Sequence, residues 1–332
     1  MPKSLTLVTG TTGLLGNNVV RLLLARDFPV RVLARQSSDP RPLEGLDVEI
    51  VRGDLRNASD VNKACEGVDR IVHSAGLVQI GRSRLDQHRA INVEGTRHIA
   101  QAARKNGARL VHISTCDLIK CSEAGTPADE DAPWADTKCC AYAVTKREAE
   151  DVVQEEIVQG LDAVIVNPGY MLGPWDWKPS SGRMLLVVAR SRGWFAPRGQ
   201  ISLCDVRDVA GGILAAFTKG RAGARYFLCG STMSYMEAWS LFAKVTGGRS
   251  PFITAGPLMM IIGGAAGDLR TRLTGREPLI NSAAVSSAWR LKHFSCKRAK
   301  EELGFENRPV EETIRDAWEW FQENGYAKEK LS

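Results

Sequence analysis

Short apolar segments alternate with longer amphipathic segments through the first half of the chain. The apolar segments are LTLVT, VRVLA, VEIVRG, RIVHSA, RLVHIS and AVIVNP, and each is followed by a stretch with helical periodicity. This alternation predicts parallel strands joined by crossover helices. Because the strand segments are apolar throughout, we expect both of their faces to be buried. The pattern predicts an α/β fold with a Rossmann-like, doubly wound parallel sheet.

The alternation ends after Pro168, where glycine, proline and tryptophan dominate the segment NPGYMLGPWDWKPSSG. Beyond it the chain is mostly helical, and an apolar segment near residues 225–229 predicts a return to the sheet. Helices are predicted over residues 235–246, 258–273, 295–303 and 310–324. We expect Ser295 to be the N-cap of the third helix and Gly304 its C-cap.

These patterns divide the chain into two parts. Residues 1–168 are expected to form the Rossmann-like domain, and the chain returns to its sheet near residues 201–230. Residues 169–200 and 231–332 are expected to form a smaller, mostly helical substrate-binding region.

Composition and charge narrow the class of protein. The 332 residues are 44% hydrophobic and 25% charged, which is typical of a globular protein with a substantial core. The net charge of +6 comes from basic residues that alternate with acids along the chain. We therefore expect no nucleic-acid-binding face.

The eight cysteines are scattered without a CxxC pair, so neither a zinc site nor a disulfide framework is expected. Such cysteines are typical of reduced thiols, which favours the cytoplasm. The first residues, MPKSLTLVTG, enter a strand pattern at once, so we expect no signal peptide.

One nearly uncharged segment, residues 252–267, complicates this picture. Its sequence, FITAGPLMMIIGGAAG, is shorter than the roughly 18 apolar residues of a membrane-spanning helix and contains Pro257 and several glycines. We expect a buried or substrate-lining helix here. The alternative is a segment that contacts a membrane peripherally or admits a lipid-like substrate.

A glycine-rich turn, TGTTGLLG, lies between the first strand and the first helix. Glycines allow a tight turn and close approach of a phosphate, and the N–H groups and dipole of the following helix attract a pyrophosphate. The spacing is GxxGxxG; a turn that serves packing alone is the alternative. The cofactor-binding residues predicted here are Gly10, Thr12, Gly13, Leu14, Leu15 and Gly16.

The end of the second strand predicts the choice of cofactor. An NAD-specific site carries an acidic residue about twenty residues after the loop, for the ribose 2′-hydroxyl. Arg35 stands there, with Ser37 close behind it, while Asp39 is too far into the loop. A guanidinium suits a 2′-phosphate, so we expect NADP(H) to be preferred over NAD(H), unless Arg35 is a solvated surface residue.

Tyr142 and Lys146 form a YxxxK pair, whose spacing places both side chains on one face of a helix. A nearby ammonium favours the phenolate, which makes a tyrosine a usable proton donor and acceptor. The pair follows the fifth strand, RLVHIS, whose end carries Ser114 and Thr115. A hydroxyl there is suited to sharing a substrate oxygen with Tyr142, and Thr115 is the first candidate.

The motifs TGTTGLLG, GDL, HSAG, INVEGT, IST, YAVTK and NPG occur in the order of the extended short-chain dehydrogenases. The chain resembles that superfamily over nearly its whole length, within the NAD-dependent epimerase/dehydratase family. It is most similar to the branch of dihydroflavonol-4-reductase-like proteins and hopanoid-associated sugar epimerases. GPWDWKPSSGR, CDVRDVAGG, RYFLCG, LTGREPL and CKRAKEELGF extend this resemblance into the second half.

The resemblance implies further site residues. Asp54 would accept a hydrogen bond from the adenine amino group and Leu55 would pack on the ring. Small residues after the fourth strand would let the cofactor cross the sheet edge, and residues after the fifth and sixth strands would border the nicotinamide. These additional positions are Ser74, Ala75, Gly76, Ser114, Pro168 and Gly169.

Two positions depart from the family pattern. Thr115 replaces the usual serine, which keeps the hydroxyl and adds a methyl group. Asp205 stands where relatives often have a histidine, so substrate contacts carried over to this segment are in doubt.

Three functions fit these residues. The first is an NADP(H)-dependent oxidoreductase that reduces a carbonyl, or oxidises the alcohol, with Tyr142 as proton donor. The second is a nucleotide-sugar epimerase or dehydratase with tightly bound NAD, which uses the same residues. The third is a redox sensor without turnover, although Tyr142 and Lys146 are both present.

The substrate region is rich in aromatic and apolar residues, which suit a bulky hydrophobic small molecule. Packing in the core is the alternative for each of them. The candidate lining residues are Tyr170, Met171, Trp175 and Met184, with Trp177 and Trp194 in the same region. The resemblance also implies a homodimer through helices over residues 87–105 and 141–159.

Overall fold

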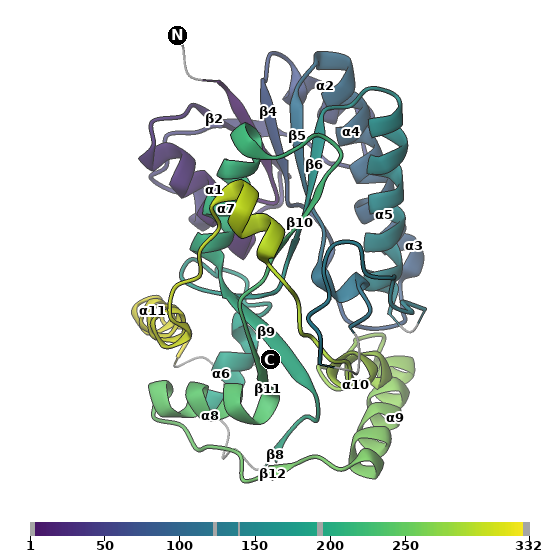
Figure 1. Ribbon diagram of the computed structural model, residues 1–332, viewed down its shortest axis with the longest axis vertical. Coiled ribbons are helices and arrows are strands. Elements are labelled where there is room, and N and C mark those ends of the chain that lie inside the picture. The colour runs from purple at the N-terminus through teal and green to yellow at the C-terminus, as the bar shows by residue number, and fades with distance from the viewer. Residues whose placement is uncertain (1–3, 122–124, 139, 191–194, 328–332) are drawn as a thin grey trace.

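The computed structural model describes residues 4–121, 125–138, 140–190 and 195–327. A seven-stranded parallel sheet forms the upper part of the molecule in Figure 1, and a smaller part lies below it. From one edge to the other the strands are β3 (Glu49–Arg52), β2 (Val30–Ala34), β1 (Thr6–Thr9), β4 (Arg70–His73), β5 (Arg109–Ile113), β6 (Ala163–Pro168) and β10 (Arg225–Leu228). The predicted Rossmann-like fold is confirmed, including the return of the chain to the sheet at β10.

Helices cover both faces of this sheet. One face carries α1 (Leu14–Ala25) and α7 (Val206–Lys219). The other carries α2 (Ala58–Cys65), α4 (Gly95–Asn106) and α5 (Ala141–Val158). A short helix α3 (Leu85–His88) continues through a π-helical segment, Arg89–Glu94, into α4. Apolar side chains fill both layers, so the sheet is a rigid platform.

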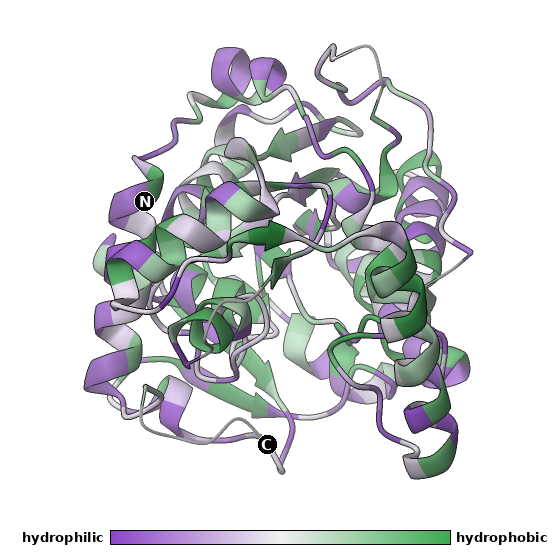
Figure 2. Ribbon diagram, turned by 90° about the horizontal axis from the view of Figure 1, so that it is seen from below, coloured by the Kyte–Doolittle hydropathy of each residue, from purple (hydrophilic) through white to green (hydrophobic). Residues whose placement is uncertain are grey.

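The sheet is not buried uniformly. The central strands are buried on both faces, but Glu49, Ile50 and Arg52 of β3 are exposed. The expectation that every strand is buried was therefore wrong for β3, which lies at one edge of the sheet, whereas β10 at the other edge is buried. Seen from below, the ribbon of the central strands is hydrophobic and the outer helices carry the hydrophilic positions (Figure 2).

The lower part contains two small sheets. One joins β11 (Ser231–Ser234), β9 (Gln200–Asp205) and β7 (Tyr170–Leu172), and the other pairs β12 (Ile253–Thr254) with β8 (Phe195–Ala196). The helices are α6 (Gly182–Arg190), α8 (Tyr235–Thr246), α9 (Pro257–Thr274), α10 (Ser282–Ala288) and α11 (Val310–Glu323). α8, α9 and α11 confirm three of the predicted helices within a residue or two.

The predicted helix over residues 295–303 is shorter in the structure. Its regular part is the π-helical turn Ala299–Leu303, which ends at Gly304 in the left-handed conformation, φ 71°. The Ser295 hydroxyl accepts a hydrogen bond from the Lys297 N–H. The C-cap prediction is confirmed, and glycine is favoured there because a left-handed φ strains other residues.

The segment over residues 252–267 differs most from expectation. Its helix, α9, is mostly exposed, with only Met260, Gly264 and Gly267 buried. The prediction of a buried helix was wrong, because the helix contacts the rest of the protein along its narrow, small-residue side. No helix in the described parts of the chain has the length and hydrophobicity of a bilayer-spanning segment.

Candidate active site

The glycine turn lies where β1 and β4 are neighbours, which is the point at which the strand order reverses. Gly10 has φ 74°, and a Cβ there would lie 2.7 Å from the backbone nitrogen of Ala75. A Cβ on Gly16 would lie 2.4 Å from the carbonyl oxygen of Gly10. Both contacts are with backbone atoms, so only glycine allows the turn to close against the end of β4.

The first turn of α1 is prepared for an anion. Gly13 is its N-cap and offers no side-chain hydrogen bond, and no acidic residue stands in the first turn. The backbone N–H groups of this turn, which starts with Leu14 and Leu15, therefore have no acidic side chain of the turn to cap them. Thr12 is partly exposed beside them. The chemistry of this cradle fits a pyrophosphate.

The end of β4 is held by short hydrogen bonds. The Ser74 hydroxyl donates to the carbonyl of Thr9 at 2.7 Å, and the Ala75 N–H donates to the Thr9 hydroxyl at 3.2 Å. A Cβ on Gly76 would lie 3.3 Å from the Asn92 side-chain oxygen. These contacts fix the residues after β4 against the end of β1.

Arg35 follows β2 directly and is exposed, as is Ser37. In the described residues, the only hydrogen bonds to Arg35 are made by its carbonyl oxygen, with Ser38 and Arg52. The nearest acid in the sequence, Asp39, is paired with Arg41 at 2.6 Å. The Arg35 guanidinium is therefore available to a phosphate, and no acid near it is free to bind a ribose hydroxyl.

Asp54 is turned toward Arg56 in this structure. The Arg56 side chain donates to both of its carboxylate oxygens, at 3.0 and 2.7 Å. This hydrogen bonding is the main reason that the pKa of Asp54 lies below its usual value, and the charge of Arg35 contributes to the same shift. Arg35, Asp54 and the partly buried Leu55 thus lie near one another, as the resemblance implies. A contact of Asp54 with adenine stays a prediction.

The predicted catalytic residues come together at the carboxyl end of β5. Tyr142 is in the first turn of α5, and Lys146 lies one turn later. Burial raises the pKa of Tyr142, and a hydrogen bond with the Thr115 side chain opposes this rise. Thr115 also caps a short 3-10 helix, since its hydroxyl accepts from the Asp117 N–H at 3.2 Å. Ser114 is buried beside it, with no partner for its hydroxyl in the described residues.

Lys146 is buried, and its ammonium donates to the carbonyl of Ile113. Burial lowers the pKa of Lys146 to about 8, and the Glu150 carboxylate opposes that shift. Glu150 is itself fixed by Asn167 and Arg225, each at 2.8 Å. The ammonium is thus held at the end of β5 and remains largely charged at neutral pH.

The end of β6 borders the same edge of the sheet. Pro168 is its last residue, and a Cβ on Gly169 would lie 2.5 Å from the carbonyl oxygen of Ser202. The glycine is needed because β9 approaches the backbone closely there.

The predicted substrate residues are mostly packed. The Tyr170 hydroxyl donates to the carbonyl of Ser181, and Met171 and Met184 lie against hydrophobic clusters. Trp175, with φ 70°, stacks under the Arg21 guanidinium at 3.3 Å. Trp175 also contacts Trp177 and Trp320. Packing accounts for these side chains without a ligand, so their role toward substrate stays a prediction; Trp194 lies outside the described residues.

Sequence reasoning missed an ion pair beside Tyr142. The Lys292 ammonium lies 2.8 Å from an Asp117 carboxylate oxygen. The Asp117 charge contributes to the raised pKa of Tyr142, which indicates that the two are close. The sequence indicates a role for Asp117 only through its position two residues after Thr115, and no sequence pattern predicts its pairing with Lys292.

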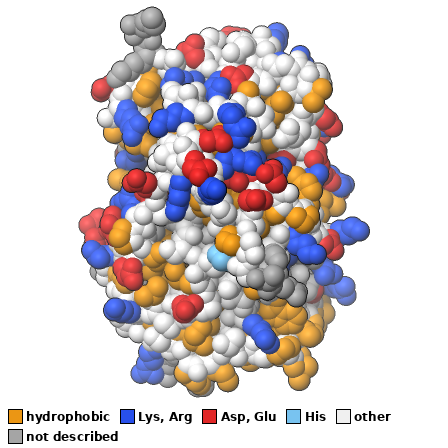
Figure 3. Space-filling model, in the orientation of Figure 1, with side chains coloured by type: hydrophobic (Ala, Val, Ile, Leu, Met, Phe, Trp, Pro, Cys, Tyr) orange, Lys and Arg blue, Asp and Glu red, His pale blue; other side chains and the backbone are white. Residues whose placement is uncertain are grey.

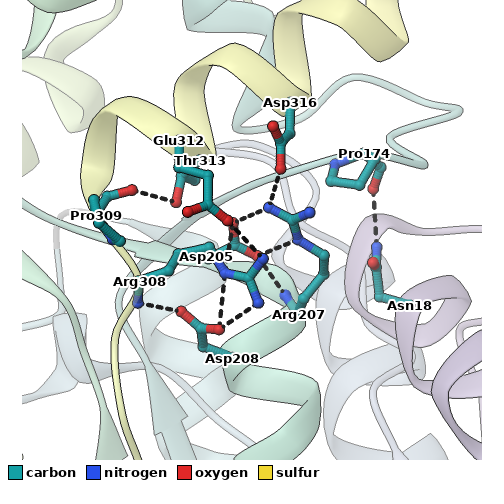
Figure 4. Close-up of polar contacts among 10 residues, drawn as sticks. All are labelled: Asn18, Pro174, Asp205, Arg207, Asp208, Arg308, Pro309, Glu312, Thr313 and Asp316. Atoms are coloured by element: carbon teal, nitrogen blue, oxygen red, sulfur yellow. Dashed lines mark hydrogen bonds and ion pairs between the residues drawn. The ribbon is translucent and has the colours of Figure 1, made fainter.

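Asp205, the departure from the family pattern, has a structural role. It is buried, caps α7 through the Arg207 N–H at 2.8 Å, and pairs with the Arg207 side chain at 2.7 Å. Arg308 lies 3.4 Å from the same carboxylate, and Arg207 also reaches Asp316 of α11 (Figure 4). The carboxylate ties α7 to α11, and these contacts occupy both of its oxygens.

Comparisons with known proteins agree with this geometry. Residues 6–230 match the model of the NAD dependent epimerase/dehydratase family. The chain is 35% identical over 324 residues to sterol demethylase protein B of Methylococcus capsulatus, covering 96% of this chain and 99% of that protein. It is 33% identical over 329 residues to a Synechocystis protein named "Putative dihydroflavonol 4-reductase", covering 97% and 95%. The crystal structure of gox2253 superposes with a TM-score of 0.85 at 29% identity, over 97% of this chain and 99% of that chain.

Proposed function

The chain belongs to the NAD dependent epimerase/dehydratase family, and from this premise we propose that it is an NADP(H)-dependent oxidoreductase. It reduces a carbonyl group of a bulky hydrophobic substrate, or oxidises the corresponding alcohol. The observation that carries this proposal is the meeting of Tyr142, Lys146 and Thr115 at the edge of the sheet that also holds the glycine turn.

The residues of this chain divide the work of the reaction. The first turn of α1 would hold the pyrophosphate, and Arg35 with Ser37 would hold the 2′-phosphate. NADPH held there would supply the hydride for the carbonyl carbon. Tyr142 donates its phenolic proton to the carbonyl oxygen, while the Thr115 hydroxyl donates a hydrogen bond to the same oxygen. Lys146 stabilises the phenolate that remains on Tyr142 until solvent returns the proton.

The preference for NADP(H) rests on Arg35. The exposed guanidinium makes no ion pair or side-chain hydrogen bond in the described residues, Asp39 is engaged by Arg41, and the nearby Asp54 is engaged by Arg56. An arginine binds a phosphate bidentately, whereas an NAD site at this position carries an acid.

A bulky hydrophobic substrate is supported by two observations. The relative with 35% identity is named for sterol chemistry. The lower part of the molecule is rich in aromatic residues, and Tyr170, Met171, Trp175 and Met184 are the proposed substrate-side residues.

A nucleotide-sugar epimerase or dehydratase with retained NAD is the second candidate. The family description and the shared Tyr142/Lys146 pair favour it, and Arg35 does not. The presence of both catalytic residues speaks against a redox sensor without turnover. We also propose a cytoplasmic enzyme, in line with eight cysteines that are scattered along the chain without a CxxC pair, and a homodimer through α4 and α5.

The experiment that separates these candidates examines the nucleotide. The purified protein is heated, any released nucleotide is identified, and the emptied protein is titrated with NADPH and NADH by fluorescence. The reductase proposal expects exchangeable binding with NADPH clearly tighter than NADH. Stoichiometric release of NAD would overturn it in favour of the epimerase.

A further inference from the structure

Helix α9 presents its large apolar side chains to the outside. Its buried residues are Met260, Gly264 and Gly267, and the face opposite them is exposed. The exposed large side chains of the helix are Leu258, Met259, Ile261, Ile262, Leu269 and Leu273. A surface helix of a globular protein normally has the reverse arrangement, with its large apolar residues inward.

Close packing fixes this orientation. A Cβ on Gly267 would lie 1.9 Å from the carbonyl oxygen of Ile280, and one on Gly264 would lie 3.2 Å from the Cα of Ser282. The segment before α10 can approach α9 this closely only on the side that carries Gly264 and Gly267, because a larger side chain there would collide with its backbone. Helices inside lipid pack in this way, with small residues at the contact and large ones facing the hydrocarbon.

The apolar face is continuous with its surroundings. Ten of the sixteen large hydrophobic side chains that are exposed in the described residues lie between residues 252 and 280. Phe252 and Ile253 precede the helix, and Leu279 and Ile280 follow it. Hydrophobic side chains gather at the lower right of Figure 3, over the position of α9 in Figure 1. We call the exposed residues between positions 252 and 280 the α9 surface.

The exposed charges of the α9 surface are all positive. Arg270, Arg272 and Arg276 are exposed at the end of the helix. The two acidic residues of the segment are partly buried, and both accept hydrogen bonds from other parts of the chain. Asp268 accepts from the Ser282 N–H at 3.0 Å, and Glu277 accepts from the N–H and hydroxyl of Ser83 at 2.8 and 2.7 Å.

We propose that the α9 surface docks on an anionic lipid membrane, with its apolar side chains in the interface and its arginines at the headgroups. An apolar face flanked by basic residues is the chemistry that such a membrane recognises. The surface does not span the bilayer, and the protein binds reversibly.

This docking deepens the proposed function and rests on it, because α10 connects the α9 surface to the catalytic tyrosine. Ala283, in the first turn of α10, packs in the same small cluster as Tyr142. Loop 80–84 holds the connection through Asn281, which donates to the carbonyl of Ile80 at 2.8 Å, and through Arg84, which donates to that of Gly275 at 3.0 Å. A hydrophobic substrate dissolved in the bilayer would therefore meet the protein beside its active site.

A second copy of the chain fits the α9 surface less well. In a two-fold symmetric contact this surface would face itself. The carboxylate on α9, Asp268, is partly buried and accepts from the Ser282 N–H, so Arg270 and Arg272 of one copy would find no fully exposed carboxylate on the α9 helix of the other. Charge complementarity favours an anionic lipid over self-association.

Flotation of the full-length protein with lipid vesicles tests the proposal. The probes are vesicles of phosphatidylcholine alone and vesicles in which phosphatidylglycerol replaces part of it. We expect the protein to float with the anionic vesicles, and Arg270→Gln with Arg272→Gln to weaken that binding about 30-fold. Ile262→Ser with Leu269→Ser should abolish flotation with the anionic vesicles.

The matched control is Val158→Ser, which removes an apolar side chain at the end of α5 that is 88% exposed, more than Ile262 at 60% or Leu269 at 56%. It should float like the unaltered protein. The proposal is overturned if the unaltered protein stays unbound, if the control loses binding equally, or if light scattering shows a dimer that Ile262→Ser converts to monomer. NADPH binding, measured without lipid, reports on the proposed function separately.

Discussion

Glu150 lies one helical turn after Lys146 on α5, and its carboxylate opposes the fall in the pKa of the buried lysine. The face of α5 that we propose to be catalytic therefore extends over Tyr142, Lys146 and Glu150. Arg225 of β10 holds the carboxylate from the other side at 2.8 Å, so the last strand of the sheet takes part in setting the charge beside the active site.

The pH profile should depend on this pair. Lys146 must be charged to stabilise the phenolate, and its pKa is about 8, so kcat/KM for reduction should fall as the pH rises through about 8. Glu150→Gln removes a negative charge that favours the ammonium, which lowers the pKa of Lys146. The alkaline limb should then move to lower pH by about one unit.

The matched control for this experiment is Glu148→Gln, on the same helix, where the carboxylate pairs with Arg89 at 2.8 Å. It should leave the alkaline limb in place. Equal shifts in both variants would mean that the limb follows net charge and not the Lys146–Glu150 pair.

Arg35→Asp should change the cofactor preference. Loss of a charge-assisted, bidentate contact weakens NADPH binding by about 10- to 100-fold, while an acid at this position can bind the ribose hydroxyl of NADH. Dissociation constants for both nucleotides, measured by fluorescence titration, give the ratio. Arg249→Asp, the same charge change on an exposed residue after α8, is the control. An unchanged ratio in Arg35→Asp would make Arg35 an ordinary surface residue.

Asp205→Asn should destabilise the protein without affecting substrate affinity. The variant removes the charge of the buried carboxylate that Arg207 and Arg308 share. The expected loss of unfolding free energy is about 2–3 kcal/mol, which is less than for a fully buried pair because both arginines are partly exposed. Glu312→Gln, which breaks a more exposed pair with Arg308, should change the free energy of unfolding by less than about 1 kcal/mol. Urea denaturation measures both. A raised KM with unaltered stability would instead assign Asp205 to the substrate.

Local chemistry made much of the site predictable from the sequence. The glycine turn is visible because Gly10 and Gly16 are each required by a nearby backbone, and Tyr142 and Lys146 because helical spacing alone aligns them. The strands were recognisable from their apolar runs, but the exposure of β3 and the burial of β10, the two edge strands, depend on what the rest of the fold packs against them.

What escaped prediction depends on contacts between distant segments. The pairing of Asp117 with Lys292 and the network around Asp205 join residues that are far apart in the chain. The orientation of α9 reversed the expectation of burial because hydrophobicity alone does not reveal which side of a helix packs. In α9 the close contact of Gly267 with Ile280 determines which side of the helix faces the protein.

Tyr142→Phe tests the central claim most directly. The variant keeps the aromatic ring and loses only the hydroxyl, so NADPH should bind with unaltered affinity while the rate of carbonyl reduction falls by about 100-fold or more. The measurement is stopped-flow oxidation of bound NADPH with a hydrophobic ketone that the unaltered protein reduces. Loss of turnover with intact binding is the predicted result, and turnover at the rate of the unaltered protein would contradict the assignment of Tyr142 as the proton donor.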